Sequence, residues 1–202
     1  MSSPVTLVLI AINVVVSILG FGARGTRRDD FVFIPSRVAR GRNVLGMFLS
    51  HFAHADSGHL LLNMMGLYFF GPVIETALGP AALLVIYVIA GALATAAIFA
   101  LRHKDIGFRA LGASGSVAGV LFAAIVVRPA MDLFLLFIPI PVPAPIFAVI
   151  YVALSSYFMG RQGSRICHEA HVGGALAGAL MAGLLAPHGF APLLHRVKEL
   201  IS

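Results

Sequence analysis

Two residues with the chemistry of a hydrolase stand at the starts of two apolar segments of this chain. Ser114 lies in the run Gly112-Ala113-Ser114-Gly115, and His171 ends the run His168-Glu169-Ala170-His171. A serine hydroxyl is a weak nucleophile until a neighbouring base takes its proton. A histidine can act as that base, and then as an acid, near neutral pH. The pair therefore predicts nucleophilic catalysis if the fold brings the two side chains together.

A second pair of polar side chains, His59 and Asn63, lies one helical turn apart in another apolar segment. Beside a serine nucleophile, such donors can stabilise the oxyanion of a tetrahedral intermediate, and one donor is worth about 3 kcal/mol. The structural alternative is that Asn63 hydrogen-bonds within the helix bundle while His59 reaches toward the membrane surface. In combination with Ser114 and His171, the pattern favours the oxyanion-stabilising role.

Glycines accompany both candidate catalytic residues. They are Gly112, Gly115 and Gly119 around the serine, and Gly173, Gly174 and Gly178 after the histidine. Glycines on a membrane helix let a neighbouring backbone approach closely. We therefore expect Gly112, Gly115, Gly174 and Gly178 to support the packing of two helices that carries the Ser114 hydroxyl toward the His171 ring. The alternative is that the glycines only pack and that Ser114 bonds to its own helix.

The composition of the chain places these residues in a membrane. Of 202 residues, 59% are hydrophobic and 11% are charged, with a mean hydropathy of +0.98, whereas a soluble domain has about 25% charged residues. We expect an integral, multi-pass membrane protein. The net charge of +6 suits contact with anionic lipid headgroups. The basic residues are spread over several short loops, which argues against binding to nucleic acid.

Six apolar segments are predicted to be transmembrane helices, because backbone groups in hydrocarbon must be satisfied within their own segment. They cover residues 4–22, 57–78, 81–101, 110–127, 144–158 and 168–186. They use most of the chain, so we predict one all-α membrane domain, a six-helix bundle over residues 1–202. The stretch 131–145 contains several prolines and cannot be regular helix throughout. Residues 160–167 are predicted to form a polar loop.

The order of the segments places the candidate residues on one side of the membrane. His59 and Asn63 begin the second segment, Ser114 the fourth and His171 the sixth. Successive spans alternate in direction, so the starts of even-numbered spans share a side. For a helix that begins at Ala110, Ser114 would lie about 6 Å farther along the axis. That depth is below the headgroups and within reach of water.

Several histidines near these segments raise the alternative of a metal site: His51, His54, His59, His168 and His171. The metalloprotease pattern has two histidines four residues apart with a glutamate after the first, whereas His168 and His171 are three apart. We therefore expect no metal. A metal-dependent protease and a small transporter with histidine-lined walls remain as alternatives. Glu75, near the far end of the second segment, is predicted to be a structural hydrogen-bonding residue.

Taken together, these motifs resemble the rhomboid family of intramembrane serine proteases. The matching elements are Phe52-x-His54-x4-His59-Leu-x2-Asn63, Gly112-x-Ser114-Gly115-x3-Gly119 and His171-x2-Gly174-x3-Gly178. The resemblance implies a six-helix bundle around a hydrated cavity and a Ser–His dyad, with Ser114 as nucleophile and His171 as general base. It implies an oxyanion hole of His59, Asn63 and the Ser114 N–H. The implied substrates are single-pass membrane proteins cut in or near their transmembrane segment, without a cofactor.

Three features depart from the family's pattern. Many members carry an aromatic residue four positions after the nucleophile, where it packs on the catalytic histidine, but this chain has Ala118. His171 must then be oriented by other neighbours. The chain has no tryptophan, so the Trp-Arg pair common in the first loop is absent. The third departure is the charge distribution, with eleven Lys and Arg residues on the side of the site and three on the other.

This charge distribution bears on how the protein lies in the membrane. Positive-inside counting places the site toward the cytoplasm, whereas the family's usual arrangement places it outside. We expect the family's arrangement, because arginines of the first loop can snorkel at the interface. For a bacterial chain, the expected location is the plasma (inner) membrane. A catalytically inactive rhomboid-like binding or chaperone protein is the alternative function, and the intact Ser114 and His171 argue against it.

Overall fold

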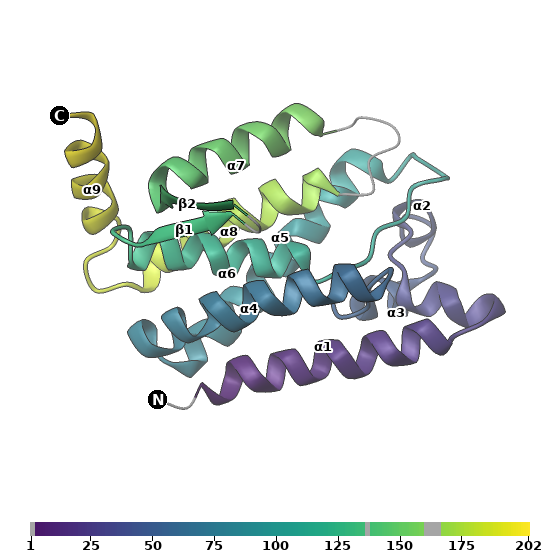
Figure 1. Cartoon of the computed structure of the whole chain (residues 1–202). Coiled ribbons are helices and arrows are strands. Elements are labelled where there is room, and N and C mark those ends of the chain that lie inside the picture. The colour runs from purple at the N-terminus through teal and green to yellow at the C-terminus, as the bar shows by residue number, and fades with distance from the viewer. Residues whose placement is uncertain (1–2, 136–137, 160–166) are drawn as a thin grey trace.

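The computed structural model of this chain describes residues 3–135, 138–159 and 167–202, most of them helical. The longer helices are α1 (Pro4–Gly22), α4 (Ser57–Leu78), α5 (Pro80–Arg102), α6 (Ser114–Val127), α7 (Ala144–Phe158) and α8 (His168–Leu185). The shorter elements are η1 (Gly25–Phe31), α2 (Pro35–Val38), α3 (Val44–Leu49), β1 (Asp132–Leu135), β2 (Ile138–Pro143) and α9 (Ala191–Ile201). Figure 1 shows the longer helices side by side, with α2 and α3 at one end of the bundle and α9 at the other.

Helices occupy all six segments predicted from apolar composition, and the all-α membrane class is confirmed. Five of the six segments match a helix within one residue at each end. By length and composition, α1, α4 and α5 are able to cross a membrane. Helices α6 and α7 are apolar but have only 14 and 15 residues, fewer than the about 20 of a typical span. The count of six spans stays a prediction.

The predicted start of the fourth segment is wrong, because α6 begins at Ser114 and not at Ala110. Phe33 and Ala110 exchange two backbone hydrogen bonds of 2.8 and 3.0 Å, and the Gly112 N–H donates to the Ser50 carbonyl at 2.8 Å. Gly112 has a φ of +126°, which glycine adopts at little cost. These contacts hold residues 110–113 outside the helix. The helical rise from Ala110 therefore does not measure the depth of Ser114.

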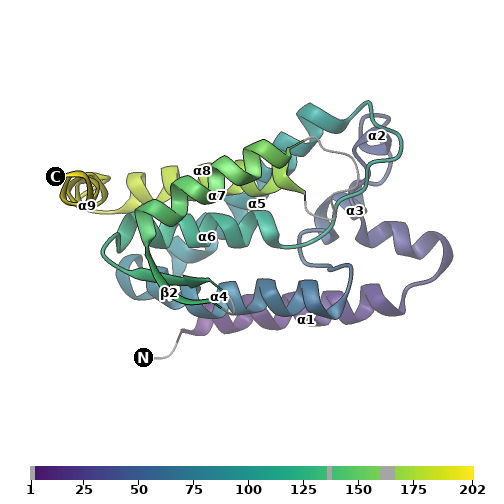
Figure 2. The same ribbon diagram turned by 45° about the horizontal axis from the view of Figure 1, so that its top comes forward.

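Helix α6 is the most enclosed helix of the bundle, and this position determines where Ser114 lies. Its residues from Gly115 to Val126 are mostly buried, and it packs against α4, α5 and α8. Val120 and Ala123 of α6 lie in one core cluster with Leu67 of α4 and Ile86 of α5. Figure 2 shows α6 lying between α4 and the α7–α8 pair. The first residue of α6 is thereby fixed inside the bundle.

The prediction that Glu75 has a structural role is confirmed at the opposite end of α4. Its carboxylate accepts hydrogen bonds from the Val5 N–H and the Thr6 N–H, both at 2.9 Å, and from the Thr6 hydroxyl at 2.6 Å. The first N–H groups of a helix have no partner within the helix. Glu75 therefore supplies acceptors for the start of α1 and ties it to α4.

The proline-rich stretch forms a β-hairpin, which agrees with the prediction that it is not continuous helix. Strand β1 pairs antiparallel with β2, from Asp132 opposite Pro143 to Leu135 opposite Ile138. Prolines alternate along β2, so their missing N–H groups fall on one edge of the strand, where proline is tolerated. Leu133 packs with Ile125 of α6 and Ala144 of α7, so the hairpin is anchored on the bundle.

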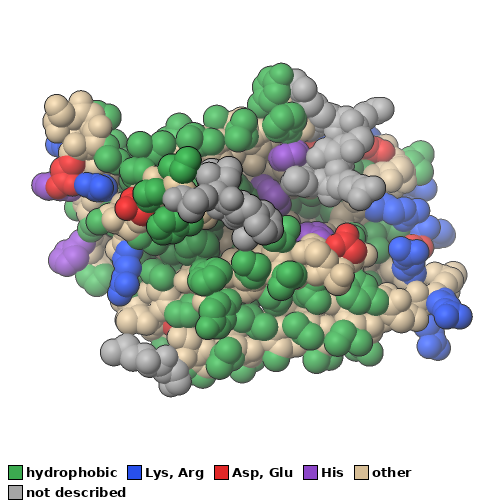
Figure 3. All heavy atoms as spheres, viewed as in Figure 1, with side chains coloured by type: hydrophobic (Ala, Val, Ile, Leu, Met, Phe, Trp, Pro, Cys, Tyr) green, Lys and Arg blue, Asp and Glu red, His purple; other side chains and the backbone are tan. Residues whose placement is uncertain are grey.

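The outer surface of the bundle is apolar over its middle and charged at its ends. Figure 3 shows hydrophobic side chains across this middle, with Lys and Arg gathered toward the two ends. Large exposed side chains include Leu7 of α1, Tyr68 and Phe69 of α4 and Val149 of α7. An apolar surface this continuous is suited to contact with lipid. The polar loop predicted over residues 160–167 lies, except for Cys167, outside the described residues.

Candidate active site

Helices α6 and α8 touch through their backbones at two levels. A Cβ atom at Gly174 would clash with the Gly115 carbonyl, and a Cβ atom at Gly178 would clash with the Gly119 carbonyl. A Cβ atom at Gly115 would lie 3.3 Å from the Ala170 carbonyl oxygen. Only glycine permits this approach of two backbones at these positions. The repeated four-residue spacing on both helices keeps the contact continuous over one turn.

This contact brings the starts of α6 and α8 to the same end of one interface. Ser114 directly precedes Gly115, and His171 lies between Ala170 and Gly174, both of which approach Gly115. Ser114 and His171 are each half-buried. The backbone contact therefore places Ser114 and His171 near the same end of the α6–α8 interface.

The His171 ring has an aromatic neighbour from a third helix. The ring of Tyr151 on α7 stacks on it, with centroids 5.9 Å apart and an interplanar angle of 21°. The His168 ring meets the His171 ring edge-on, with their centroids 6.1 Å apart. Sequence reasoning left open which neighbour orients His171. Tyr151 is 20 residues before His171 in the chain, and no motif pointed to it.

His59 lies against the residues that lead into Ser114. The Asp56 carboxylate accepts from the His59 N–H at 2.8 Å and caps α4. A Cβ atom at Gly112 would lie 2.6 Å from Cε1 of the His59 ring, so the absence of a side chain at Gly112 makes room for the imidazole. The structure thus places the His59 ring beside the segment that precedes Ser114.

Asn63 is buried one turn farther along α4. Its side-chain nitrogen donates to the His59 carbonyl at 2.9 Å. An amide nitrogen carries two hydrogens, so one hydrogen remains available for a second acceptor. The structure therefore places Asn63 beside His59 as expected from their spacing, with part of its donor capacity used inside its own helix.

His54 supports the segment before Ser114, and sequence reasoning gave it no role of its own. The Ala113 N–H donates to Nε2 of His54 at 3.4 Å, and Nδ1 lies 2.9 Å from the Ser17 hydroxyl. With Nε2 accepting, Nδ1 carries the ring proton and donates to Ser17. Burial, reinforced by repulsion from His59, lowers the pKa of His54 to about 4. His54 is therefore neutral at physiological pH and holds the residue next to the candidate nucleophile.

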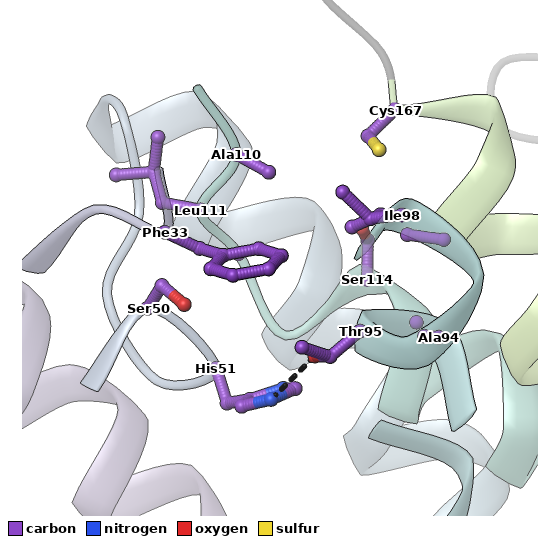
Figure 4. A pocket seen from close by; sticks show the side chains of 13 residues that line it. Phe33, Ser50, His51, Ala94, Thr95, Ile98, Ala110, Leu111, Ser114 and Cys167 are labelled. Carbon is purple, nitrogen blue, oxygen red and sulfur yellow. Dashed lines mark hydrogen bonds between the residues drawn. The ribbon is translucent and has the colours of Figure 1, made fainter. Parts of the chain in front are cut away.

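A small cavity of about 30 Å³ lies beside Ser114. Figure 4 shows Phe33, Ala110 and Cys167 among the side chains around it, and His51 bonded to Thr95 at its base. The His51 Nε2 lies 2.8 Å from the Thr95 hydroxyl oxygen. A space of this size can hold a water molecule, which needs at least about 10–15 Å³.

An ion pair fixes the first turn of α8, and it was not foreseen. The Arg102 guanidinium at the end of α5 donates two hydrogen bonds to one carboxylate oxygen of Glu169, which is buried; that from Nε is 2.7 Å long. The Cys167 thiol donates to the other oxygen at 3.7 Å. Burial raises the pKa of Cys167 to about 12, so this thiol stays protonated near neutral pH. Glu169 lies two residues before His171.

The histidines do not assemble into a metal site in the part of the chain that the structure describes. Across residues 3–135, 138–159 and 167–202, no three His, Cys, Asp or Glu side chains lie close enough together to hold a metal ion. His54 and His59 contact each other edge-on, with centroids 5.0 Å apart. His51 bonds to Thr95 and lies apart from that pair.

Comparison with known proteins identifies relatives of this chain. It is 33% identical over 150 residues to RHOMBOID-like protein 12, mitochondrial, of Arabidopsis thaliana, covering 66% of this chain and 44% of that protein. It is 31% identical over 134 residues to Rhomboid protein 1, mitochondrial, of Saccharomyces cerevisiae, covering 65% of this chain and 39% of that protein. It is 28% identical over 180 residues to Presenilin-associated rhomboid-like protein A, mitochondrial, of Danio rerio, covering 87% of this chain and 46% of that protein.

The chain spans less than half the length of these curated relatives. All three have mitochondrial names, so they give no support to the expected bacterial plasma membrane, while the integral membrane location stands on the apolar helices. The rhomboid domain matches residues 41–188, a range that includes His59, Asn63, Ser114 and His171. The chain belongs to the rhomboid family.

Proposed function

We propose that this protein is an intramembrane serine endopeptidase that cleaves single-pass membrane proteins in or near their transmembrane segment. The observation that carries the proposal is the backbone contact of α6 and α8 at Gly115 and Gly174. It supports a dyad because Ser114 and His171 flank that contact. Membership of the rhomboid family supports the same reaction class. We also propose that residues 1–202 act as one membrane domain.

In the first half of the proposed reaction, Ser114 attacks the scissile carbonyl carbon of an unwound substrate segment. His171 takes the hydroxyl proton as the bond to carbon forms. It then gives that proton to the leaving amine when the peptide bond breaks, which leaves an ester on Ser114. Unwinding is needed because a helical peptide bond is shielded by its own turn. Substrate would enter beside α4 or α7, which border the bundle (Figure 1).

In the second half, a water molecule attacks the ester carbonyl carbon, and His171 takes a proton from that water. The proton returns to the Ser114 oxygen as the second product leaves, so the enzyme is restored and no cofactor is consumed. In both halves, negative charge develops on the carbonyl oxygen. The Ser114 N–H has no partner within α6, because it is in the first turn. With His59 and the remaining Asn63 hydrogen, it is suited to stabilise this oxyanion.

The proposal is tested by labelling and cleavage with purified protein in vesicles that contain a single-span substrate. We expect a fluorophosphonate to label the wild type, and Ser114→Ala to abolish both labelling and cleavage. His171→Ala should abolish cleavage as well. Both variants should keep the wild-type melting temperature. Ser156→Ala on α7 and His195→Ala on α9 are matched controls, since both residues are exposed, and they should retain activity.

Each alternative function predicts a different result in the same assay. Labelling that persists in Ser114→Ala would reject Ser114 as nucleophile. A wild type that folds but shows neither labelling nor cleavage would support an inactive binding or chaperone protein. Cleavage that chelators inhibit and serine reagents do not would support a metal-dependent protease. Solute flux without labelling would support a transporter.

A further inference from the structure

The ring of Tyr151 occupies a defined position between α7 and the α6–α8 pair. It stacks on His171 at a centroid distance of 5.9 Å with an interplanar angle of 21°. It also contacts Phe122 of α6 at 5.3 Å and Phe147 of α7 at 5.9 Å. Tyr151 is thereby held by aromatic rings from two helices. A ring fixed in this way restricts how the imidazole that lies on it can rotate.

The His171 ring has two aromatic neighbours among the described residues. One is Tyr151, which comes from another helix. Its remaining aromatic neighbour, His168, belongs to the same helix and meets it edge-on. Among the ring contacts of the described residues, only Tyr151 packs face to face on His171.

Ala118 explains why the aromatic partner of His171 comes from α7. Ala118 lies one turn after Ser114 on α6 and is buried in a cluster with Phe122 and Ala175. Tyr151 and its neighbours Ala148 and Val152 pack against that cluster. The small side chain of Ala118 leaves space on the α6–α8 interface, and the Tyr151 side chain enters it from α7.

We propose that Tyr151 is the positioning residue that holds the His171 imidazole in the orientation for proton transfer with Ser114. Because Tyr151 belongs to α7, the dyad is aligned only while α7 is docked on α6 and α8. Helix α7 contacts the bundle along one side and exposes Val149, Leu154 and Tyr157 on the other. This inference rests on the proposed protease function.

The kinetic test compares three substitutions of Tyr151 in the full chain. Tyr151→Phe keeps the stacked ring and should keep kcat within about twofold. Tyr151→Leu keeps apolar bulk but removes the ring, and we expect kcat to fall by about 10- to 100-fold with KM little changed, since small misplacements of a catalytic group can cost about 10² in rate. Tyr157→Leu, at an exposed tyrosine on the same helix, is the control and should behave as the wild type.

A second-site variant tests whether kcat depends on an aromatic ring against His171 or only on the stability of the fold. The double variant Tyr151→Leu with Ala118→Tyr supplies an aromatic ring from α6 to the same cluster. We expect it to recover at least tenfold in kcat over Tyr151→Leu alone. Equal melting temperatures across the series would separate orientation from loss of structure. If Tyr151→Leu lowers the melting temperature so far that the unfolded fraction accounts for its loss of kcat, the positioning role is overturned.

An NMR measurement on histidine-labelled protein in micelles reads the stack without any activity. The His171 ring signal is assigned by its disappearance in His171→Gln. Tyr151→Leu should shift this signal through loss of the ring current, while Tyr157→Leu should not. An unmoved signal in Tyr151→Leu would overturn the stack, and a moved signal with unchanged kcat would overturn the positioning role. If the wild type shows no Ser114-dependent labelling, the proposed function fails, and the NMR result alone decides whether Tyr151 orients the ring.

Discussion

At the scale of single residues, His54 affects the candidate site without facing a substrate. Both of its ring nitrogens are used, one by the Ala113 N–H and the other by the Ser17 hydroxyl. Its side chain is almost completely buried, and a protonated ring could not accept from Ala113. His171 differs in its proposed role, because a general base must exchange its proton in every cycle. Histidines in one chain thus take separate roles that depend on what their nitrogens bond to.

The neutral state of His54 predicts that acid destabilises the fold. Its pKa in the folded protein is about 4, below the ordinary value of about 6.5 expected when unfolded. Between these values the unfolded state binds more protons, so stability falls as pH is lowered from about 6.5 toward 4. We expect the melting temperature of wild type to fall over this range more steeply than that of His54→Gln, which can still accept from Ala113 but does not titrate.

The measurement is thermal unfolding in detergent at a series of pH values between 4 and 7. His51 is half-buried, and its partial burial lowers its pKa, so a smaller slope should remain in His54→Gln. The double variant with His51→Gln should flatten the slope further. Parallel curves for wild type and His54→Gln would contradict a neutral, structurally bonded His54.

At the scale of elements, glycine spacing decides how α6 and α8 meet. A Cβ atom at Gly178 would clash with backbone atoms of Gly119, which cannot move aside as a flexible side chain can. Alanine is otherwise a better helix former than glycine by about 1 kcal/mol. The sign of a glycine-to-alanine change therefore reports whether the backbone contact exists.

We expect Gly178→Ala to destabilise the protein by roughly 1–3 kcal/mol, the usual cost of overpacking, and to lower cleavage because α8 carries His171. Gly22→Ala at the end of α1 is the matched control, since nothing lies within 4 Å of its Cβ position. It should be neutral or slightly stabilising. Denaturant or thermal unfolding of both variants makes the comparison. Equal stability of the two would argue against the α6–α8 contact.

The elements also show what sequence can and cannot predict for this chain. Helix positions follow from uninterrupted apolar runs, a local property. Gly115, Gly174 and Gly178 lie in the contact of α6 with α8, whereas Gly112 precedes α6 and faces the His59 ring. The start of α6 was missed because it depends on Phe33 and Ser50, which lie far away in the chain. The prolines excluded helix before α7 but did not specify a strand pairing. Arg102 and Glu169 are 67 residues apart, and no local pattern joins them.

At the scale of the whole molecule, the site and the C-terminal helix lie at opposite ends of the bundle. Ser114 and His171 are at the starts of α6 and α8, while α9 follows the end of α8 (Figure 1). Helix α9 carries charged residues on one side and exposes Leu194, Val197 and Ile201, as expected for a helix lying in the membrane surface. The two ends should therefore contact different aqueous compartments.

The distribution of Lys and Arg residues and the usual arrangement of the rhomboid family predict opposite orientations of these two ends in the membrane. Eleven Lys and Arg residues lie on the side of the site and three on the other, which by the positive-inside rule favours a cytoplasmic site. Several of the eleven already have partners within the protein: Arg37 and Arg109 approach Asp29, and Arg102 binds Glu169. Arginines of the first loop can also snorkel to the interface. We therefore predict that the site faces away from the cytoplasm.

Single cysteines placed at Lys104 and Lys198 test this orientation, in a Cys167→Ser background that removes the only native thiol. Both positions are exposed, one in the loop before α6 and the other in α9. In sealed vesicles of known sidedness, a membrane-impermeant maleimide should label Lys104→Cys from the non-cytoplasmic side and leave Lys198→Cys unlabelled until detergent is added. The reverse pattern would mean that the arginine excess determines the orientation and that the site opens to the cytoplasm. Labelling of both from one side would show that the bundle does not separate its two ends.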